Sequence, residues 1–337
     1  MKNIDLEPLP GMDKPEREEF VSLAAGPFRN ELLAHCYRML GSLHDAEDLV
    51  QDTFLRAWRA FDQFNPERGT LRAWLYRIAT NVCLTWLRDH RPRSLPSELV
   101  PQADNPATYP TTRYPETNWI EPFPGILLGT DRDDPAAIVT SRASIRLAFI
   151  AALQHLPPRQ RATLILRDVL AWRSAEVADL LETTPTAINS ALQRARTQLS
   201  QVGLIEEDMT EPSDAEQLDV LNRYVSAFQD SDLTALTGLL REDALMEMPP
   251  WLHWMRGREA VVAFLGAIFG RRAPGAWRVL TTSANRQPAM ASYRRGDDGI
   301  FRAANIQLFT ITGEGISHMV AFMDPTLFSA FSLPNTV

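Results

Sequence analysis

Several features that mark other classes of protein are scarce or missing in this sequence of 337 residues. No run of about 18 apolar residues, the length that crosses a membrane, occurs in it. Its first residues also lack the basic and then apolar order of a signal peptide. The two cysteines, Cys36 and Cys83, lie far apart in apolar helical patterns, which favours buried free thiols over a disulfide or a metal pair. We therefore expect a cytoplasmic protein without a membrane partner.

Positive charge is also in short supply, since the net charge of the chain is −8. That balance would count against a nucleic-acid-binding protein if it were even along the chain. Residues 141–201, however, carry a net charge of +4, whereas residues 94–140 and 202–337 carry −5 and −6. Because salt screens charges beyond about 10 Å, the local excess governs attraction to phosphate groups.

The hydrophobic pattern divides the chain into segments of different character. Residues 28–93 and 141–201 are predicted to be helical, because apolar residues recur there at intervals of three and four. Residues 94–140 are rich in proline and acidic, and form a linker in this prediction. The segment Trp119–Pro124 within it either docks on a neighbouring domain or belongs to a solvated spacer. After an acidic connector, residues 202–214, we expect helices at 216–230, 233–240 and 257–270 and strands at 277–284, 289–295, 301–312 and 315–323.

Residues 174–201 have the pattern of a helix-turn-helix. Ser174 is expected to cap the first helix, Thr184 to cap the second, and Pro185 to occupy its first turn. The second helix buries one stripe, formed by Ile188, Ala191, Leu192, Ala195 and Leu199. Its opposite face carries the polar and basic residues Thr186, Asn189, Ser190, Gln193, Arg194 and Arg196. Asn and Gln pair with adenine and Arg reaches guanine or phosphate, so this face is predicted to contact DNA. The alternative is an ordinary helical hairpin with a polar face.

The residues before this hairpin extend the pattern. Leu156-Pro157-Pro158-Arg159-Gln160-Arg161 and Leu166-Arg167-Asp168-Val169, followed by the helix-turn-helix, resemble region 4 of the extracytoplasmic-function class of bacterial RNA polymerase sigma factors. In this class of the sigma-70 family, region 4 binds the −35 promoter element. Glu182 stands where these proteins often have glycine, and Asn189-Ser190-Ala191 where many have Lys-Ser-Arg. The second departure bears on the DNA sequence that is recognised.

The N-terminal half contains a second match. The run Asp45–Phe54 resembles sigma region 2.2, which grips the β′ coiled coil of RNA polymerase core. The resemblance implies that Asp48, Leu49, Gln51 and Asp52 contact the core. Taken without the order of motifs, an acidic helix edge of this kind would simply face solvent.

A basic and aromatic stretch follows. Between Arg68 and Arg93 the sequence has six arginines and a single acid, interleaved with Trp74, Tyr76 and Trp86. Aromatic rings either stack on unpaired bases or belong to the core. The stretch resembles sigma regions 2.3 and 2.4, which melt and hold the −10 element. On that match Arg77, Asn81, Arg88 and Arg91 are the DNA-facing candidates.

The last 130 or so residues resemble the SnoaL-like α+β cone, which a subgroup of these sigma factors carries. The match begins with the helical run Asp219–Phe228 and continues through Met246–Trp251 and Arg256–Val261. Such a cone usually encloses a pocket for a small-molecule ligand, for which apolar walls with few polar groups are typical. The expected lining is Trp251, His253, Trp254, Met290, Phe309, His318, Phe322 and Asp324. His318 and Asp324 form either an acid–base pair or, separately, a core histidine and a turn residue.

The sequence thus predicts a multidomain protein with two all-α sigma domains and a C-terminal α+β cone. The expected ranges are 25–93 for region 2, 94–140 for the linker, 141–201 for region 4 and 215–331 for the SnoaL-like domain. Such a protein directs RNA polymerase core to promoter DNA, is regulated by its own C-terminal domain, and needs no catalytic residue, cofactor or metal. The alternatives are a DNA-binding protein fused to a cyclase- or isomerase-like enzyme domain, and a ligand-responsive repressor.

Overall fold

The computed structural model describes residues 28–67, 69–108, 110, 113–114, 117–128, 144–201, 213–271 and 275–337. They fold into two compact units. Unit 1 holds the described residues up to Arg91 together with Leu156–Arg196, and unit 2 holds Pro92–His155 and Thr197–Val337. Most of the expected connector, residues 202–212, and the expected domain ends at 25–27, 129–140 and 141–143 lie outside the described residues.

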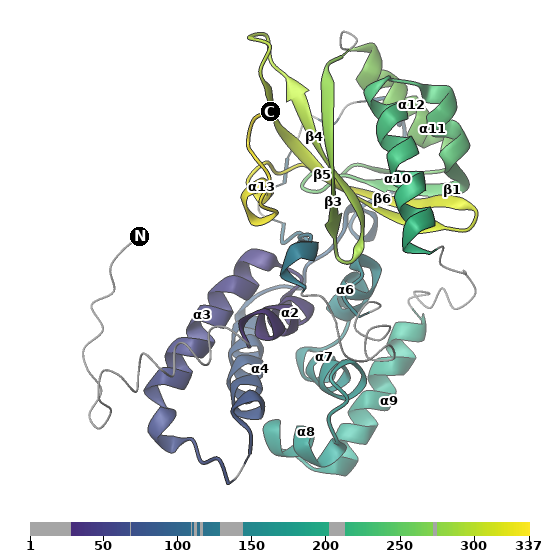
Figure 1. Ribbon diagram of the computed structural model, residues 1–337. Coiled ribbons are helices and arrows are strands. Elements are labelled where there is room, and N and C mark those ends of the chain that lie inside the picture. The colour runs from purple at the N-terminus through teal and green to yellow at the C-terminus, as the bar shows by residue number, and fades with distance from the viewer. Residues whose placement is uncertain are drawn as a thin grey trace. The chain divides into compact units, whose positions relative to one another are not determined.

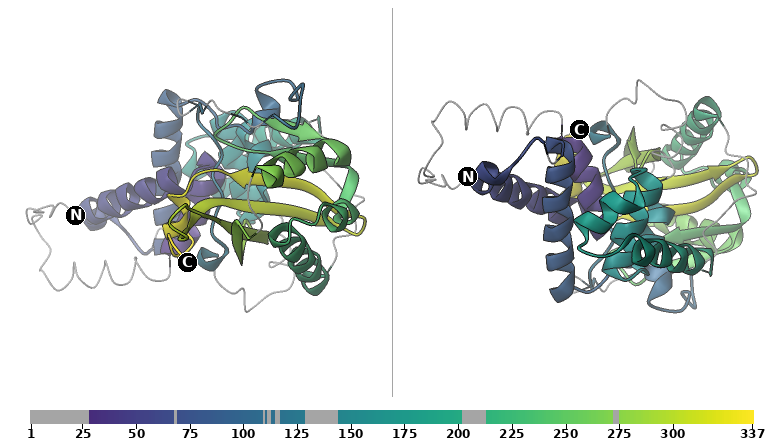
Figure 2. Two further views of the ribbon diagram at one scale, coloured as in Figure 1. Left: turned by 90° about the horizontal axis from the view of Figure 1, so that it is seen from above. Right: turned by 90° about the horizontal axis from the view of Figure 1, so that it is seen from below.

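Unit 1 begins with three helices, α2 (Arg29–Leu40), α3 (Leu43–Arg59) and α4 (Leu71–Asp89), and a short 3-10 turn η1 (Phe61–Gln63). Side-chain caps fix two of the helix starts, because Ser42 Oγ accepts a hydrogen bond from Asp45 N and Thr70 Oγ1 accepts one from Ala73 N. The helices α3 and α4 cross each other, as both views of Figure 2 show. Their apolar faces form a core with α2, as the periodicity predicts.

The second part of unit 1 is the predicted helix-turn-helix. Helix α7 (Pro158–Leu164) runs into a π-helical turn η4 (Ile165–Val169), and α8 (Ser174–Leu180) and α9 (Pro185–Gln201) follow. Thr184 Oγ1 accepts from Ala187 N at 3.2 Å, so the expected cap of α9 is confirmed. The expected cap of α8 is wrong: Arg173 occupies the N-cap position and donates its backbone N–H to Glu176, whereas Ser174 is the first helical residue. Glu182 has a φ of +52° in the turn, the conformation that favours glycine.

Buried polar groups join α7 to the first three helices. The Arg161 guanidinium is 1% exposed and donates to the backbone oxygens of Met39 and Leu156, and burial lowers the pKa of Arg161 to about 10. Cys36 and Cys83 lie in the same core as free, buried thiols, which confirms the expectation from the sequence. A hydrogen bond with Cys36, together with burial, raises the pKa of the Cys83 thiol. Unit 1 is therefore one packed body that contains both helical segments.

Unit 2 is built on a six-stranded sheet with the strand order β2-β1-β6-β5-β4-β3. The strands are β1 (Leu240–Glu247), β2 (Trp254–Arg256), β3 (Trp277–Ala284), β4 (Gln287–Arg295), β5 (Phe301–Thr312) and β6 (Gly315–Phe322). All neighbours are antiparallel except β1 and β6, which are parallel. The four later strands match the expected positions; β1 and β2 were not expected, because the charged run Arg241–Asp243 hides the alternation of β1.

Both faces of this sheet are covered. Helices α10 (Asp214–Gln229), α11 (Leu233–Leu239) and α12 (Arg258–Gly270) lie over one face in Figure 1. On β4 the consecutive residues Ala289–Tyr293 are all buried, which requires cover on the opposite face as well. Part of that cover is α13 (Leu327–Ala330), whose Phe328 packs edge-on against Tyr293. The α+β fold expected for this part of the chain is confirmed.

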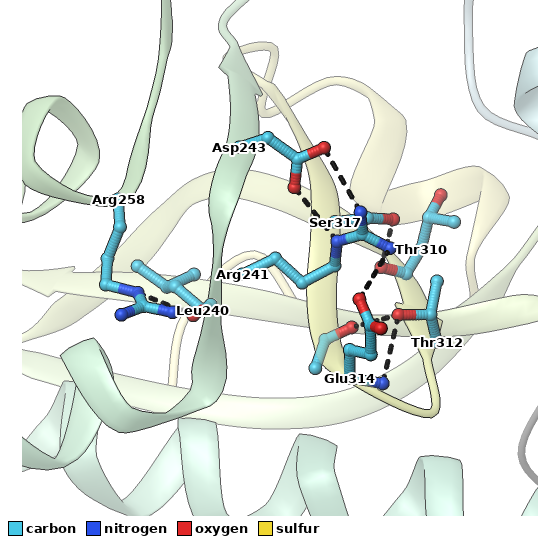
Figure 3. Close-up of polar contacts among 9 residues, drawn as sticks. Leu240, Arg241, Asp243, Arg258, Thr310, Thr312, Glu314 and Ser317 are labelled. Atoms are coloured by element: carbon cyan, nitrogen blue, oxygen red, sulfur yellow. Dashed lines mark hydrogen bonds and ion pairs between the residues drawn. The ribbon is translucent and has the colours of Figure 1, made fainter.

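The turn between β5 and β6 is held close to β1. Figure 3 shows Arg241 of β1 between Asp243, which it binds through two nitrogens, and Glu314 of the turn, at 3.5 Å. Gly315 follows with a φ of +119°, and a Cβ atom there would lie 2.7 Å from the carbonyl oxygen of Leu239. This close approach requires a residue without a side chain.

Candidate nucleic-acid interface and the linker-binding turn

The outer face of α9 is available to a ligand. The six residues predicted to face DNA are all exposed: Thr186, Asn189, Ser190, Gln193, Arg194 and Arg196. The opposite face of α9 buries Ile188, Leu192 and Ala195, and Ile188 packs in the helix-turn-helix core. Two of the exposed side chains are already oriented by neighbours. Ser174 Oγ donates to Asn189 Oδ1 at 2.7 Å, and Arg196 binds both carboxylate oxygens of Asp168 at 2.7 and 2.9 Å.

Helix α4 carries the second set of candidates. Asn81 and Arg88 are exposed on it, and Arg91 is exposed just beyond its end. Arg77 forms an ion pair with Asp179 of α8, so in this structure the guanidinium contacts the helix-turn-helix. This ion pair and the buried Arg161 place the two predicted DNA-binding segments in one compact unit.

The aromatic residues of α4 divide between core and surface. Tyr76 is 1% exposed, and Trp74 packs against Phe61 and Phe64 in a small aromatic cluster. Trp86 is only half-buried and stacks on His90 with ring centroids 3.7 Å apart. Tyr76 therefore belongs to the core and Trp74 to the aromatic cluster. Of the three aromatic residues, Trp86 is the best candidate for stacking on an unpaired base.

The acidic edge of α3 contains the candidates for core binding. Asp48 and Gln51 are exposed, and Asp52 is half-buried beside Arg56, with which it forms an i, i+4 ion pair at 2.9 Å. Leu49 is 8% exposed, so most of its side chain lies in the helical core. Of the four candidates, three present a polar group at the surface.

The proline-rich linker lies along unit 2 over much of its described length. It contains two short 3-10 turns, η2 (Pro96–Glu98) and η3 (Gly125–Leu127), in keeping with its prolines. Trp254 Nε1 donates to Val100 O at 2.9 Å, and Tyr114 N donates to Pro250 O at 3.1 Å. Within the aromatic segment, Trp119, Ile120 and Phe123 are buried. Docking of this segment on a neighbouring domain, one of the two alternatives, is therefore confirmed.

The turn between β3 and β4, residues 284–287, binds the linker most extensively; we call it the linker-binding turn. Asn285 accepts from Phe123 N through Oδ1 and donates its own backbone N–H to Phe123 O, both at 2.8 Å. Its Nδ2 donates to Ile145 O at 2.7 Å, on the far side of residues 129–143. Asn285 and Arg286 both have positive φ, as a two-residue hairpin turn requires, and Asn tolerates that conformation. Sequence reasoning missed this turn, although an Asn between two strands marks such a hairpin.

The turn continues this pattern on either side of Asn285. Arg286 Nη2 donates to Leu128 O at 3.1 Å, and Gln287 Oε1 accepts from Leu147 N at 3.0 Å, the first residue of α6 (Leu147–Gln154). Consequently three consecutive side chains bind the backbone on both sides of the linker's undescribed part.

A buried carboxylate binds the start of the linker. Glu247 is 1% exposed, accepts from Ser97 N at 2.8 Å and lies 2.9 Å from His318 Nε2. Burial opposes ionisation of this carboxyl, but the hydrogen bond and charge of His318 outweigh it, so the pKa of Glu247 lies below its usual value. Asp324 instead accepts from the backbone and hydroxyl of Thr326 within a turn. His318 thus pairs with Glu247 and not with Asp324.

Unit 2 contains a cavity of about 440 Å³ between its sheet and helices α10 and α12. Of the eight residues expected to line a pocket, Trp251 lines this cavity. Met290, Phe309 and Phe322 are buried in the hydrophobic core. His253 and Trp254 contact the linker, through hydrogen bonds with the backbone of Pro106 and of Val100. Burial lowers the pKa of His253, and its hydrogen bond opposes this shift. A pocket lined by the other expected residues stays a prediction, since strand alternation alone does not show where helices leave space.

Comparison with known proteins divides the chain in the same order. Residues 26–93 match the family described as Sigma-70 region 2, residues 146–199 match Sigma-70, region 4, and residues 221–321 match the SnoaL-like domain. Among the described helices, none combines the length and apolarity needed to cross a bilayer.

Two relatives from Mycobacterium tuberculosis resemble most of the chain. The ECF RNA polymerase sigma factor SigG is 46% identical over 323 residues, which cover 96% of this chain and 86% of SigG. The ECF RNA polymerase sigma factor SigJ is 30% identical over 254 residues, 73% of this chain and 72% of SigJ. The crystal structure of SigJ aligns with a TM-score of 0.59 at 25% identity and covers 94% of this chain and 99% of that one.

Proposed function

The chain belongs to the extracytoplasmic-function RNA polymerase sigma factors, and we propose that its C-terminal domain regulates it by binding the linker between regions 2 and 4. As a sigma factor it binds RNA polymerase core and directs it to promoter DNA for transcription initiation. That work takes place in the cytoplasm, where polymerase and promoters are. The hydrogen bonds of Asn285 to Phe123 and Ile145 are the observation that carries the regulatory part of the proposal.

The surface groups described above are assigned to the steps of initiation. Asp48, Gln51 and Asp52 on α3 bind the polymerase core, with Leu49 supporting them from beneath. On α4 and just beyond it, the −10 element is held by Arg77, Asn81, Arg88 and Arg91. On α9, the −35 element is read by Thr186, Asn189, Ser190, Gln193, Arg194 and Arg196. The exposure of the six candidates on α9, and of Asn81, Arg88, Arg91, Asp48 and Gln51, supports the assignment.

Regulation through the linker follows from what regions 2 and 4 must do. They bind two promoter elements that lie apart on the DNA, yet both belong to one compact unit held by Arg161 and by the Arg77–Asp179 ion pair. The two regions must therefore separate, and the segment that joins them must change its path. A domain that binds this segment at Phe123 and Ile145 biases the equilibrium between the packed and the separated arrangement.

The domain has this role in place of catalysis. Among the described residues that line its cavity there is neither a carboxylate nor a histidine, the groups that most often serve as general acid and base. The buried carboxylate of Glu247 pairs with His318 and accepts a hydrogen bond from Ser97 of the linker, outside the cavity lining. Both observations favour a regulatory domain over a fused cyclase or isomerase.

Run-off transcription with purified polymerase core tests the proposal. Removal of residues 206–337 takes away the linker's partner, so promoter activity should change several-fold at matched soluble concentration. Asn285→Ala removes two hydrogen bonds to the linker and should shift activity in the same direction as the deletion. Whether activity rises or falls depends on whether the bound linker favours the packed or the separated arrangement of regions 2 and 4.

Asn222→Ala is the matched control, because Asn222 is exposed on α10 of the same domain. It should leave transcription at the level of the unaltered protein. Equal activity of the full-length, truncated and Asn285→Ala proteins would overturn the regulatory proposal. Turnover of a small molecule by the full-length chain would favour the enzyme alternative.

A further inference from the structure

The cavity of unit 2 has the size and the walls of a small-molecule site. Its volume of about 440 Å³ falls within the range of roughly 300–1,000 Å³ that is typical of such sites. Apolar side chains from α10, α12 and the sheet form most of the wall, namely Phe228, Met246, Met248, Trp251, Phe264, Leu265, Ile268, Trp277, Ala321 and Met323. A ligand that fills this space needs an apolar body.

The charged side chains among the described residues that line the cavity are all of one sign. Four arginines line it, Arg113, Arg271, Arg294 and Arg302, and no carboxylate is among its described lining residues. Arg294 of β4 and Arg302 of β5 are direct cross-strand partners, an arrangement that is unfavourable for like charges. Asp298 neutralises Arg302 through two hydrogen bonds, at 2.5 and 2.8 Å. The positive charge of Arg113 and Arg294 is suited to an anionic group, and a guanidinium binds a carboxylate with particular geometric fit.

A buried polar side chain belongs to the same wall. Asn305 of β5 lines the cavity, is 8% exposed, and its Oδ1 has no hydrogen-bond partner within the described part of the chain. Buried amide oxygens are rarely left without a donor. Asn305 can therefore receive a hydroxyl or amide hydrogen from a bound molecule.

One of the four arginines comes from the linker. Arg113 donates to Met323 O at 2.7 Å and lies over the indole ring of Trp251, 6.0 Å from its centroid. Met323 and Trp251 both line the cavity. An anion bound beside Arg113 would thus contact the linker and the domain at once, and would stabilise the linker in its bound path.

We propose that this cavity binds an organic acid, with its apolar body between the sheet and α12 and its carboxylate held by Arg113 and Arg294. The effect of the ligand on transcription rests on the proposed function, since the bound acid would strengthen the binding of the linker by the C-terminal domain. The ligand class itself follows from the cavity alone. A neutral molecule of the same shape would pack against the apolar walls but would form no ion pair with Arg113 and Arg294.

Isothermal titration of the full-length protein with decanoate and naphthoate tests the ligand class, with decanol and naphthylmethanol as the uncharged counterparts. Each acid should bind at least about tenfold more tightly than its alcohol, as a charge-assisted contact provides. Arg113→Gln and Arg294→Gln should each weaken binding of the acids several-fold and leave the alcohols unchanged. Arg295→Gln is the control, since Arg295 is exposed on the same strand but does not line the cavity.

Equal affinities for acid and alcohol, failure of both acids to bind, or an equal loss in Arg295→Gln would overturn the proposal. Bound acid should also slow proteolytic cleavage of the linker in the unaltered protein and not in Arg113→Gln. These measurements contain no polymerase and no DNA. A negative binding result would therefore count against the ligand class and not against regulation by the domain. Equal transcription by the full-length and truncated proteins would count against regulation and not against the ligand class.

Discussion

His35 of α2 is a buried histidine whose surroundings fix its charge. The side chain has no exposed surface, and its Nε2 lies 2.9 Å from Thr80 Oγ1 of α4. Burial, with a smaller contribution from the charge of Arg38, lowers the pKa of His35 to about 3. The sequence shows only a histidine within an apolar helical run, so the packing of three helices decides its protonation state.

The stability of unit 1 should therefore depend on pH. The unfolded histidine takes up a proton below about pH 6.5, whereas the folded one stays neutral until about pH 3, so protons favour the unfolded state between these values. The contribution is fully present above pH 6.5 and falls by up to about 1.4 kcal/mol per pH unit below it. Hydrogen exchange of the α2 amides at a series of pH values, analysed as free energies of opening, measures this fall.

His35→Gln removes the titrating group and should flatten the pH dependence between 6.5 and 4. His44→Gln serves as the control, because His44 is exposed on α3. An unchanged slope in His35→Gln would mean that other groups cause the acid sensitivity of this unit.

At the scale of the element, α9 shows how a helix acquires a DNA-reading face. Its buried stripe fixes which side meets the helix-turn-helix core, and its exposed side then carries amides and cations without an acid between Pro185 and Gln201. The hydrogen bond from Ser174 orients the amide of Asn189 before DNA arrives, and Asp168 holds Arg196. Pre-ordered side chains lose less conformational freedom on binding.

Substitutions on α9 should separate base reading from phosphate binding. Asn189→Ala or Gln193→Ala should relax the base preference at one or two positions of the −35 element, at a cost of roughly 1–3 kcal/mol there. Arg196→Ala, which removes a cation expected to touch phosphate, should weaken binding to all sequences by a similar factor. Selection of bound sequences from a randomised −35 library measures both effects. A uniform loss in all three variants would contradict base reading by this helix.

At the scale of the whole molecule, the sigma factor must bind the polymerase core through an edge that contributes little to its own fold. Asp48 and Gln51 are exposed, and the ion pair of Asp52 with Arg56 lies at the surface. Such groups add little to stability. The combined change Asp48→Ala, Gln51→Ala and Asp52→Ala should weaken core binding by about tenfold or more and alter stability by no more than about 0.5 kcal/mol for each residue.

A titration of labelled polymerase core with the full-length protein gives the affinity, and thermal unfolding gives the stability. Arg56→Ala is a suitable control, because it breaks the same ion pair and leaves the acidic edge in place. Core affinity that is equal in all three proteins would count against the assignment of this edge.

The sequence alone was enough for the family, most helices and most strands of this chain. Periodicity and caps are local properties, so α9 begins at Pro185 behind Thr184, and the later strands lie where alternation predicts them. The order of the motifs on one chain identified both sigma regions, because that order is itself a property of the sequence.

Only the tertiary structure decided which distant groups meet. Strand β1 was not predicted, because the charged residues Arg241 and Asp243 interrupt its hydrophobic alternation; in the fold these two residues pair with each other. The strand is held by pairing with β2 and β6, which come later in the chain. Likewise, His318 meets Glu247, and Asn285 meets the linker at Phe123. Such contacts join residues separated by 71 and 162 positions. Local pattern has no means to specify them, since they arise when the sheet forms and the linker packs along it.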